Sequence, residues 1–427
     1  MPLCCWDLLW FAQYPLVLFG LYTDTFHLWS AKKSRKDEQI RTSIPPFPFL
    51  NILNHKNTSM KRSTLFLASL LIACSAMAET IPATDKRITI VGRTATDGTA
   101  VSFDWTATTI RVAYSGKSLT MKVSDTKRNY YNVWIDSPAS NEPDRIIATS
   151  GTDSVITLVS PDDPVNKTRR GIHEVVLQKR TEGEQGTTTI IEFTADKFYP
   201  ATPLSDRQLE FVGDSYTCGY GSENSVKTDP FTPETENSSK TYAAIVARYF
   251  GADYVAIAHS GMGITRNYNS KYDGWWMPER YMQTFDMDST QATRWTAEKS
   301  DFRPAMTVIY LGANDFSVAM QPKYEKFRDQ YYKLLREIKA NYGEYYPVLC
   351  IATKAHEYLF TYIRELVNNC GMKNVHYLGL CPALHDNDSD LGVSSHPNYQ
   401  GHQKIAYSVI PYVATITGWG LQDEPVK

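Results

Sequence analysis

The pattern of hydrophobic and polar positions along the chain changes near residue 200. From residue 85 to about 200, short runs rich in β-branched and aromatic residues recur, such as "RITIVGR", "SLTMKVSD" and "HEVVLQKRTE". Gly, Asn, Asp and Pro separate these runs at intervals of roughly ten residues, which is typical of an all-β sandwich. We therefore predict a β-sandwich domain over residues 79–200, with Trp105 and Trp134 in its core.

From residue 201 to 427 the apolar runs become nearly continuous, as in "QLEFVGD", "ADYVAIAH", "AMTVIYLG", "YPVLCIAT" and "VHYLGL". Strands that are buried on both faces have this composition. The stretches between them have helical periodicity; residues 324–343, for example, carry one apolar stripe that ends at Gly343. Alternating strands and helices predict a parallel sheet with helices on both sides.

The N-terminus has the features of a targeting segment. Residues 60–78, "MKRSTLFLASLLIACSAMA", combine two basic residues, an apolar run and a small-residue end. This layout predicts a secretory signal peptide that is cleaved before Glu79. Because a signal should begin a protein, we expect Met60 to be the true start and residues 1–59 to be a non-native extension.

The segment "LIAC" also resembles the lipobox of a bacterial lipoprotein, in which Cys74 would be lipidated. Free export to the periplasm or the medium is favoured, because the apolar core before a cleavage at Cys74 would be very short. A lipid anchor through Cys74 remains the alternative.

The charge of the chain indicates no nucleic-acid partner. The 427 residues carry a net charge of −2, and the chain without residues 1–78 would carry 36 basic and 42 acidic residues, a net charge of −6. No Lys/Arg run occurs in the body of the chain, so no basic footprint is present. The four cysteines beyond residue 78 lack metal-ligand spacing, and their pairing cannot be deduced from the sequence.

Residues suited to acyl transfer follow three of the predicted parallel strands. Ser215 follows the first strand, Gly261 the second and Asn314 the third, while His396 lies in a loop before the last helix. A serine nucleophile needs an imidazole to accept its proton and hydrogen-bond donors to stabilise the oxyanion. Glycine at 261 would let a backbone N–H approach the substrate closely.

Each of these signals has an ordinary structural alternative. "GDS" is a common turn, and Asn314 or Asp315 could simply cap a helix. The order of the four signals within one α/β domain favours an active site, because function gathers at the carboxyl ends of parallel strands.

The motifs resemble a known group of hydrolases. "GDSYTCGYG", "SGMGITRNY", "YLGAND" and "HPNYQGHQKIA" resemble the four blocks of the SGNH (GDSL-type) hydrolases. Upstream, "GRTATDGTAVSFDW", "YNVWID" and "HEVVLQKRTEGEQG" are similar to the sandwich domain of carbohydrate esterase family two. The resemblance implies a jelly-roll-like β-sandwich followed by a flavodoxin-like three-layer α/β/α hydrolase domain.

The resemblance also implies roles for particular residues. Ser215 corresponds to the nucleophile and His396 to the general base, while Ser215, Gly261 and Asn314 correspond to the oxyanion hole. The family implies removal of acetyl groups from plant polysaccharides or their oligosaccharides, commonly xylan or glucomannan, without a cofactor or metal.

One departure concerns the third member of a catalytic triad. The wider superfamily has an aspartate three residues before the histidine, where this chain has Val393. Asp390 and Asp388 are the nearest upstream acids. We hypothesise a Ser–His dyad in which a backbone carbonyl orients His396, with Asp390 as the weaker candidate for a third member.

A long connection after the second strand, residues 271–286, contains four aromatic residues: Tyr272, Trp275, Trp276 and Tyr281. They are candidates for stacking on sugar rings above the active site. Packing between the two domains is an equally good interpretation.

Two other functions fit the sequence less well. The protein could be a lipid or thioester hydrolase of the same superfamily, although no long apolar stretch of the catalytic half indicates an acyl-chain tunnel. It could instead be a non-catalytic carbohydrate-binding protein, but Ser215, Gly261, Asn314 and His396 are all present.

Overall fold

The computed structural model describes residues 78–168, 171–270, 274–290, 292–318, 320–352, 357–381 and 386–422. The predicted extension 1–59, Cys74 and nearly all of the predicted signal peptide lie outside these residues. Within the described residues, no helix is both long and apolar enough to cross a membrane.

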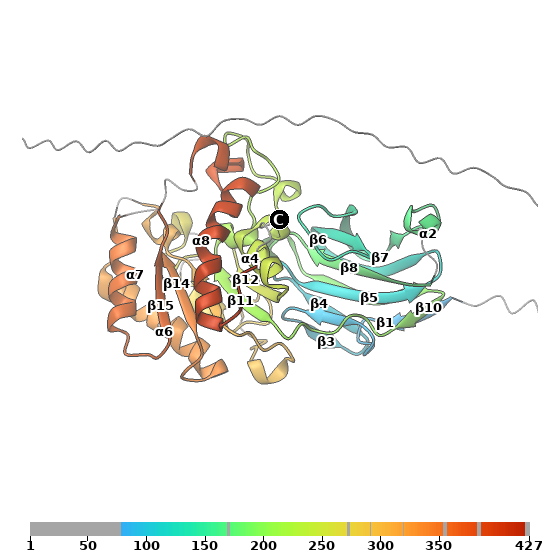
Figure 1. The fold of residues 1–427 in the computed structure, drawn as a ribbon, viewed down its shortest axis with the longest axis horizontal. Helices are drawn as coiled ribbons and strands as arrows, with labels where there is room; N and C mark the ends of the chain where they lie inside the picture. Colours follow the sequence, from blue (N-terminus) through green and yellow to red (C-terminus); the bar gives the residue numbers. More distant parts are fainter. Residues whose placement is uncertain are drawn as a thin grey trace, which may run out of the picture. The chain divides into compact units, whose positions relative to one another are not determined.

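The N-terminal domain is a single ten-stranded antiparallel sheet that curls around its own core (Figure 1). Its main path runs in the order β10-β5-β8-β6-β9-β4-β3, with β1, β2 and β7 added beside β9, β5 and β6. The strands are β1 (Glu79–Pro82), β2 (Thr89–Val91), β3 (Ala95–Asp97), β4 (Ala100–Phe103), β5 (Thr109–Ser115), β6 (Leu119–Ile135), β7 (Arg145–Val159), β8 (Ile172–Lys179), β9 (Thr188–Ala195) and β10 (Lys197–Tyr199).

The core of this domain comes from alternate residues of its strands. Phe103, Tyr114, Met121, Tyr131 and Leu177 are all buried in one hydrophobic cluster. A strand that buries one face places every second side chain in the core, which produces the period-two pattern of the sequence. The predicted β-sandwich is thus built from one curled sheet, and a short helix, α2 (Val165–Thr168), follows β7.

The second domain is built on five parallel strands in the order β12-β11-β13-β14-β15. The strands are β11 (Gln208–Gly213), β12 (Asp253–Ala258), β13 (Thr307–Tyr310), β14 (Val348–Ala352) and β15 (Val375–Gly379). In sequence order this is 2-1-3-4-5, the order of flavodoxin-like sheets. The predicted fold class is therefore confirmed, and the predicted boundary at residue 200 falls between β10 and β11.

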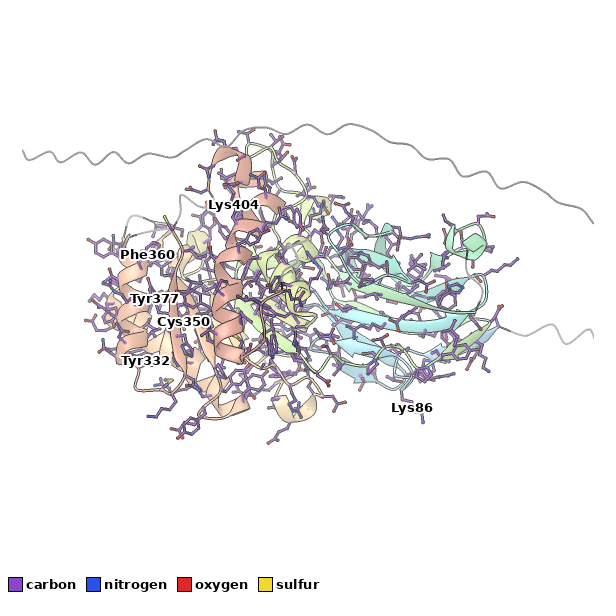
Figure 2. The ribbon with its side chains drawn as sticks, viewed as in Figure 1. Lys86, Tyr332, Cys350, Phe360, Tyr377 and Lys404 are labelled. Carbon is purple, nitrogen blue, oxygen red and sulfur yellow. The ribbon has the colours of Figure 1, made fainter. Side chains whose placement is uncertain are left out.

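Helices cover both faces of the parallel sheet. The helices are α3 (Ser215–Cys218), α4 (Tyr242–Phe250), α5 (Met277–Arg280), α6 (Tyr324–Tyr342), α7 (Glu357–Asn369) and α8 (Tyr399–Thr417). Helices α4 and α8 share one hydrophobic cluster with Phe211 of β11, whereas α6 and α7 share the other with Val212. Figure 2 labels three residues of this second cluster: Phe360 on α7, Cys350 on β14 and Tyr377 on β15.

Ion pairs join the two domains, and one of them is fully buried. The guanidinium of Arg93, from the first domain, lies 3.2 Å from the carboxylate of Glu210 on β11, and both side chains are buried. Arg111 of β5 pairs with Asp253 of β12. A buried charge is tolerated only when it is paired and hydrogen-bonded, so these contacts fix how the two domains meet.

Candidate active site

Ser215 lies where the central strand of the parallel sheet ends. Strand β11 ends at Gly213, and Asp214 caps α3 by accepting a hydrogen bond from the N–H of Tyr216 at 3.2 Å. Ser215 is the first residue of α3, so its N–H is one of the donors that a helix leaves unsatisfied at its start. This turn places both the hydroxyl and the N–H of Ser215 at the carboxyl edge of the sheet, where the residue is 7% exposed.

The structure brings Ser215 and His396 together across 181 residues of sequence. The Ser215 Oγ atom lies 2.8 Å from Nε2 of His396. On the other side of the ring, Nδ1 lies 3.1 Å from the carbonyl oxygen of Ser394. Since a carbonyl can only accept, Nδ1 carries the proton and Nε2 is free to accept the proton of the serine hydroxyl.

Asp390 does not occupy the position of a third triad member. Its buried carboxylate accepts hydrogen bonds from Lys404 at 2.8 Å and from Gln400 and Asn387 at 3.0 Å each. Lys404 lies on α8, where Figure 2 labels it. Burial raises the pKa of Asp390, but the bonds from Lys404 and Asn387 outweigh burial and leave it below the ordinary value. Asp390 is thus held by other residues, and Nδ1 of His396 faces the Ser394 carbonyl instead.

The turn before His396 has a strained backbone, which hydrogen bonds to the segment around Lys227 and Asp229 hold in place. Ser394 and Ser395 both have left-handed backbones, with φ of 53° and 59°. Such conformations cost non-glycine residues about 1–3 kcal/mol each. The Ser394 N–H donates to the carbonyl of Asp229 and the Ser395 N–H to that of Lys227, both at 3.2 Å. These bonds hold the Ser394 carbonyl where the imidazole needs it.

The candidate oxyanion donors lie on the ends of three neighbouring strands. Among the described residues, no acceptor pairs with the N–H of Ser215 or of Gly261. Gly261 has φ of +80°, a left-handed conformation that glycine adopts without strain. The Asn314 amide donates to the carbonyl of Met262 at 2.9 Å and to Asp214 at 3.2 Å, which places it between the other two loops.

Asp315 holds this arrangement and was not recognised as a site residue from the sequence. Its carboxylate accepts hydrogen bonds from the N–H groups of Ile264, Thr265 and Arg266 at 2.7–3.1 Å. The loop after β12 is thereby tied to the loop after β13. Burial raises the pKa of Asp315 to about 6, and the three N–H donors oppose that rise.

The structure changes the interpretation of the aromatic connection. Tyr281 is fully buried, and its ring lies 4.9 Å from the guanidinium of Arg93, which belongs to the first domain. Its proposed role in stacking on sugars is therefore wrong, and the alternative role in packing between the domains is confirmed. Trp275 lies under the guanidinium of Arg280, and Trp276 lies 4.8 Å from the Lys326 ammonium. Both tryptophans are partly exposed. Tyr272 lies outside the described residues.

Other aromatic residues border the catalytic pair. The rings of Tyr220 and His396 are 4.5 Å apart, and Phe231 stacks on the far side of Tyr220 at 3.8 Å. Tyr268 is 53% exposed and lies beside Gly261, to whose carbonyl its N–H donates at 2.7 Å. The positions of Tyr220 within "GDSYTCGYG" and of Tyr268 within "SGMGITRNY" were the available sequence signal, whereas Phe231 lies outside both motifs and is recognised only from the fold.

The surroundings of His396 predict an unusually acidic pH limit. Burial lowers the pKa of His396 to about 4, and the hydrogen bond to Ser394 offsets only part of that fall. A general base must be neutral, so activity should be lost as the pH falls through about 4 rather than through 6.5, the ordinary value. We expect the acid limb of kcat/KM at this low pH.

The Asp390→Asn variant is the control for this limb. With the dyad, kcat/KM and its acid limb should stay within about threefold of wild type, because Asp390 does not touch the imidazole. A loss of about a hundredfold or more in a variant that circular dichroism shows to be folded would instead make Asp390 part of the catalytic apparatus.

Comparisons with known proteins agree with this fold and site. Residues 211–404 match the model of the GDSL-like lipase/acylhydrolase family, so the chain belongs to this class of hydrolases. Residues 90–203 match the N-terminal domain model of carbohydrate esterase 2. With both domains in this order, the chain belongs to carbohydrate esterase family two, as the sequence resemblance implied.

Curated relatives match large parts of the chain. The cellulase/esterase CelE of Acetivibrio thermocellus is 30% identical over 324 residues, which are 74% of this chain and 38% of that protein. An acetylxylan esterase/glucomannan deacetylase of Cellvibrio japonicus is 30% identical over 226 residues, 51% of this chain and 57% of that protein. The chain thus spans well under two thirds of the length of these two relatives.

Solved structures have the same two-domain fold. A family two carbohydrate esterase from Clostridium thermocellum in complex with cellohexaose is 28% identical, with a TM-score of 0.68. The match covers 78% of this chain and all of that one. A family two esterase from Cellvibrio japonicus, 23% identical with a TM-score of 0.69, shares the fold.

Proposed function

We propose that the protein is an exported serine esterase that removes O-acetyl groups from plant cell-wall polysaccharides or their oligosaccharides, such as acetylated xylan or glucomannan. The observation that carries the proposal is the 2.8 Å contact between Ser215 Oγ and His396 Nε2, together with the backbone N–H groups of Ser215 and Gly261, for which the described residues offer no acceptor. Ester hydrolysis needs these three parts: a nucleophile, a base and a place for the oxyanion.

In the first half of the reaction, Ser215 Oγ attacks the acetyl carbonyl carbon while His396 Nε2 accepts the hydroxyl proton. The carbonyl oxygen becomes an oxyanion, which the N–H groups of Ser215 and Gly261 and the amide of Asn314 stabilise. The bond to the sugar oxygen then breaks, and the imidazolium returns the proton to that oxygen. An acetyl group is left on Ser215 and the free sugar hydroxyl departs.

In the second half, a water molecule attacks the acetyl-serine and His396 accepts its proton. Collapse of the second tetrahedral intermediate releases acetate and returns the proton to Ser215. Among the described residues, the partner of Nδ1 is the Ser394 carbonyl and not a carboxylate, so the imidazolium that forms in each half has no paired negative charge there. The Ser394 carbonyl and the rings around His396 therefore have to orient it.

The substrate class and the location rest on additional support. A relative with 30% identity carries the name acetylxylan esterase/glucomannan deacetylase. Tyr220 borders His396, Phe231 stacks on Tyr220, and Tyr268 lies beside Gly261. All three rings are at least partly exposed, and such rings can stack on sugars. Export is supported by the signal-like residues 60–78, with lipidation of Cys74 as the alternative route to the cell surface.

Acetate release from defined substrates tests the proposal. We expect the protein to release acetate from acetylated xylan or glucomannan and to cleave 4-nitrophenyl acetate at least about tenfold faster than the octanoate ester, measured as kcat/KM. Faster cleavage of the long-chain ester would favour a lipid hydrolase. The absence of any ester cleavage would favour a carbohydrate-binding protein.

A further inference from the structure

A buried polar segment extends from the curled sheet into the catalytic domain. The segment consists of Lys179, where β8 ends, and the next three residues, Arg180, Thr181 and Glu182. Each of these four residues is at most 1% exposed. Arg180 reaches Glu223 at 2.7 Å and the carbonyl of Glu236 at 3.3 Å, both in the catalytic domain. Burying several charges is costly, and apolar residues of similar size are often at least as stabilising. A positional role would explain why these charges are present.

The carboxylate of Glu182 contacts two segments that carry candidate oxyanion donors, the one with Ser215 and the one with Gly261. Its Oε2 atom accepts a hydrogen bond from the N–H of Ser260 at 2.5 Å. Ser260 directly precedes Gly261, whose N–H is a candidate oxyanion donor. The same oxygen lies 3.5 Å from Sγ of Cys218, the last residue of the short helix that Ser215 begins. One side chain of the first domain thus joins two active-site segments of the second.

Glu182 itself is fixed by the residues around it. Lys179 donates to the Glu182 carbonyl at 3.0 Å, and the Glu182 N–H donates to Glu236 at 3.1 Å. At the next position, a side chain larger than that of Gly183 would overlap Asp286. The carboxylate therefore has little freedom to follow the Ser260 loop, and the loop is held against it.

A second contact from the first domain supports the same loop. His259, immediately before Ser260, pairs through Nδ1 with Asp286 at 2.6 Å. The N–H of Asp286 donates to Asp104 of the curled sheet at 2.7 Å. The loop that presents Gly261 is therefore tied to the first domain at two adjacent residues.

We propose that Glu182 is a positioning residue for the oxyanion hole, which makes the curled sheet domain part of the catalytic apparatus. By accepting from the Ser260 N–H, Glu182 fixes the His259–Ser260 peptide. This peptide directly precedes the Ser260–Gly261 peptide, so fixing it restricts the direction in which the Gly261 N–H points. The inference rests on the proposed esterase function. It adds that this function requires a residue from outside the hydrolase domain.

The same side chains could instead hold a metal ion. Ligand atoms of Glu182, Cys218 and Glu236 all lie within 4.8 Å of one another. The Glu182 oxygen in this group, however, already accepts from Ser260 and lies near the Cys218 thiol, so hydrogen bonds account for its position. Metal analysis of the purified protein separates the two interpretations.

The test compares Glu182→Met, which keeps the length without an acceptor, with Glu182→Gln, which keeps an oxygen acceptor. For Glu182→Met we expect kcat on 4-nitrophenyl acetate to fall about 10- to 100-fold with KM within about threefold, because a misplaced donor weakens only the transition state. Inhibition by methylboronic acid, whose tetrahedral Ser215 adduct places an oxygen in the hole, should weaken by a similar factor. Glu182→Gln should stay within about fivefold of wild type.

Glu210→Gln is the matched control, because Glu210 is equally buried between the domains but does not touch the Ser260 loop. It should lower Tm while leaving kcat and boronate inhibition unchanged. The inference is overturned if Glu182→Met keeps wild-type kcat and boronate inhibition, if Glu210→Gln loses as much as Glu182→Met, or if a stoichiometric metal is lost with Glu182. A wild-type protein without esterase activity would refute the proposed function, and boronate affinity would still test the positioning role.

Discussion

Replacing Ser215 by alanine should reduce acetate release by about 10⁴- to 10⁶-fold, with little change in substrate binding. Among the described residues, the hydroxyl is the only group that the His396 imidazole contacts through Nε2, so the variant loses the nucleophile that the base activates. The measurement is kcat/KM on an acetylated oligosaccharide, with circular dichroism to establish that the variant is folded.

Ser222→Ala is the matched control for Ser215→Ala. Ser222 is a buried serine of the same segment whose hydroxyl donates to the carbonyl of Asn237 at 3.1 Å, away from His396. It should lower stability and leave kcat within about threefold. Because Ser215 and His396 act as a unit, the double alanine variant should be no slower than either single variant. Multiplying losses would show that the two residues act independently.

The second large effect concerns Asn314. Replacement by alanine should lower kcat by about 10²- to 10³-fold, the loss typical of one oxyanion-hole donor. In the structure both amide hydrogens are occupied, and the longer bond, at 3.2 Å to Asp214, is the one that an oxyanion can replace. Hydrogen bonds of this kind often align fully only in the substrate complex.

Separate measurements of kcat and KM for Asn314→Ala distinguish a donor to the oxyanion from a residue that only holds the neighbouring loops in place. A donor that acts only in the transition state should lower kcat and leave KM nearly unchanged. If Asn314→Ala instead leaves kcat intact and only lowers Tm, Asn314 merely braces the loops around Asp214 and Met262. The third donor would then have to be sought elsewhere.

The fold follows from the sequence to a large extent. Residues 208–214 read as a strand buried on both faces, and β11 indeed packs Phe211 against one helical layer and Val212 against the other. The stripe of residues 324–343 became α6, because an apolar face at helical spacing can only be buried as a helix. Strand order required the superfamily resemblance, since several orders satisfy the same alternation of strands and helices.

The site was less accessible to sequence reasoning, for specific physical reasons. The group that Nδ1 of His396 contacts is the backbone carbonyl of Ser394. Every residue has a backbone carbonyl, so the sequence does not indicate which one faces the imidazole. Asp390 was a reasonable candidate by spacing, but a salt bridge to Lys404 on α8 holds its carboxylate away. The sugar-stacking role considered for Tyr281 was wrong because Arg93, from the other domain, covers its ring. The residues that neighbour Tyr281 in the sequence do not indicate this contact.

The position of Glu182 could not be predicted from the sequence either. The "RTE" ending was useful only as a family signal, because nothing in residues 180–182 indicates a partner 78 residues away at Ser260. Contacts between domains are long-range by nature, so they become visible only with coordinates.

The central claim is that His396 alone activates Ser215. Peptide mass mapping after inactivation by diethyl 4-nitrophenyl phosphate tests it most directly, because attack by the serine expels nitrophenolate and leaves a stable diethylphosphoryl ester. We expect one such group per chain, on Ser215, at the same rate in Asp390→Asn and absent in His396→Ala. A label on another residue, or equal labelling in His396→Ala, would contradict the account.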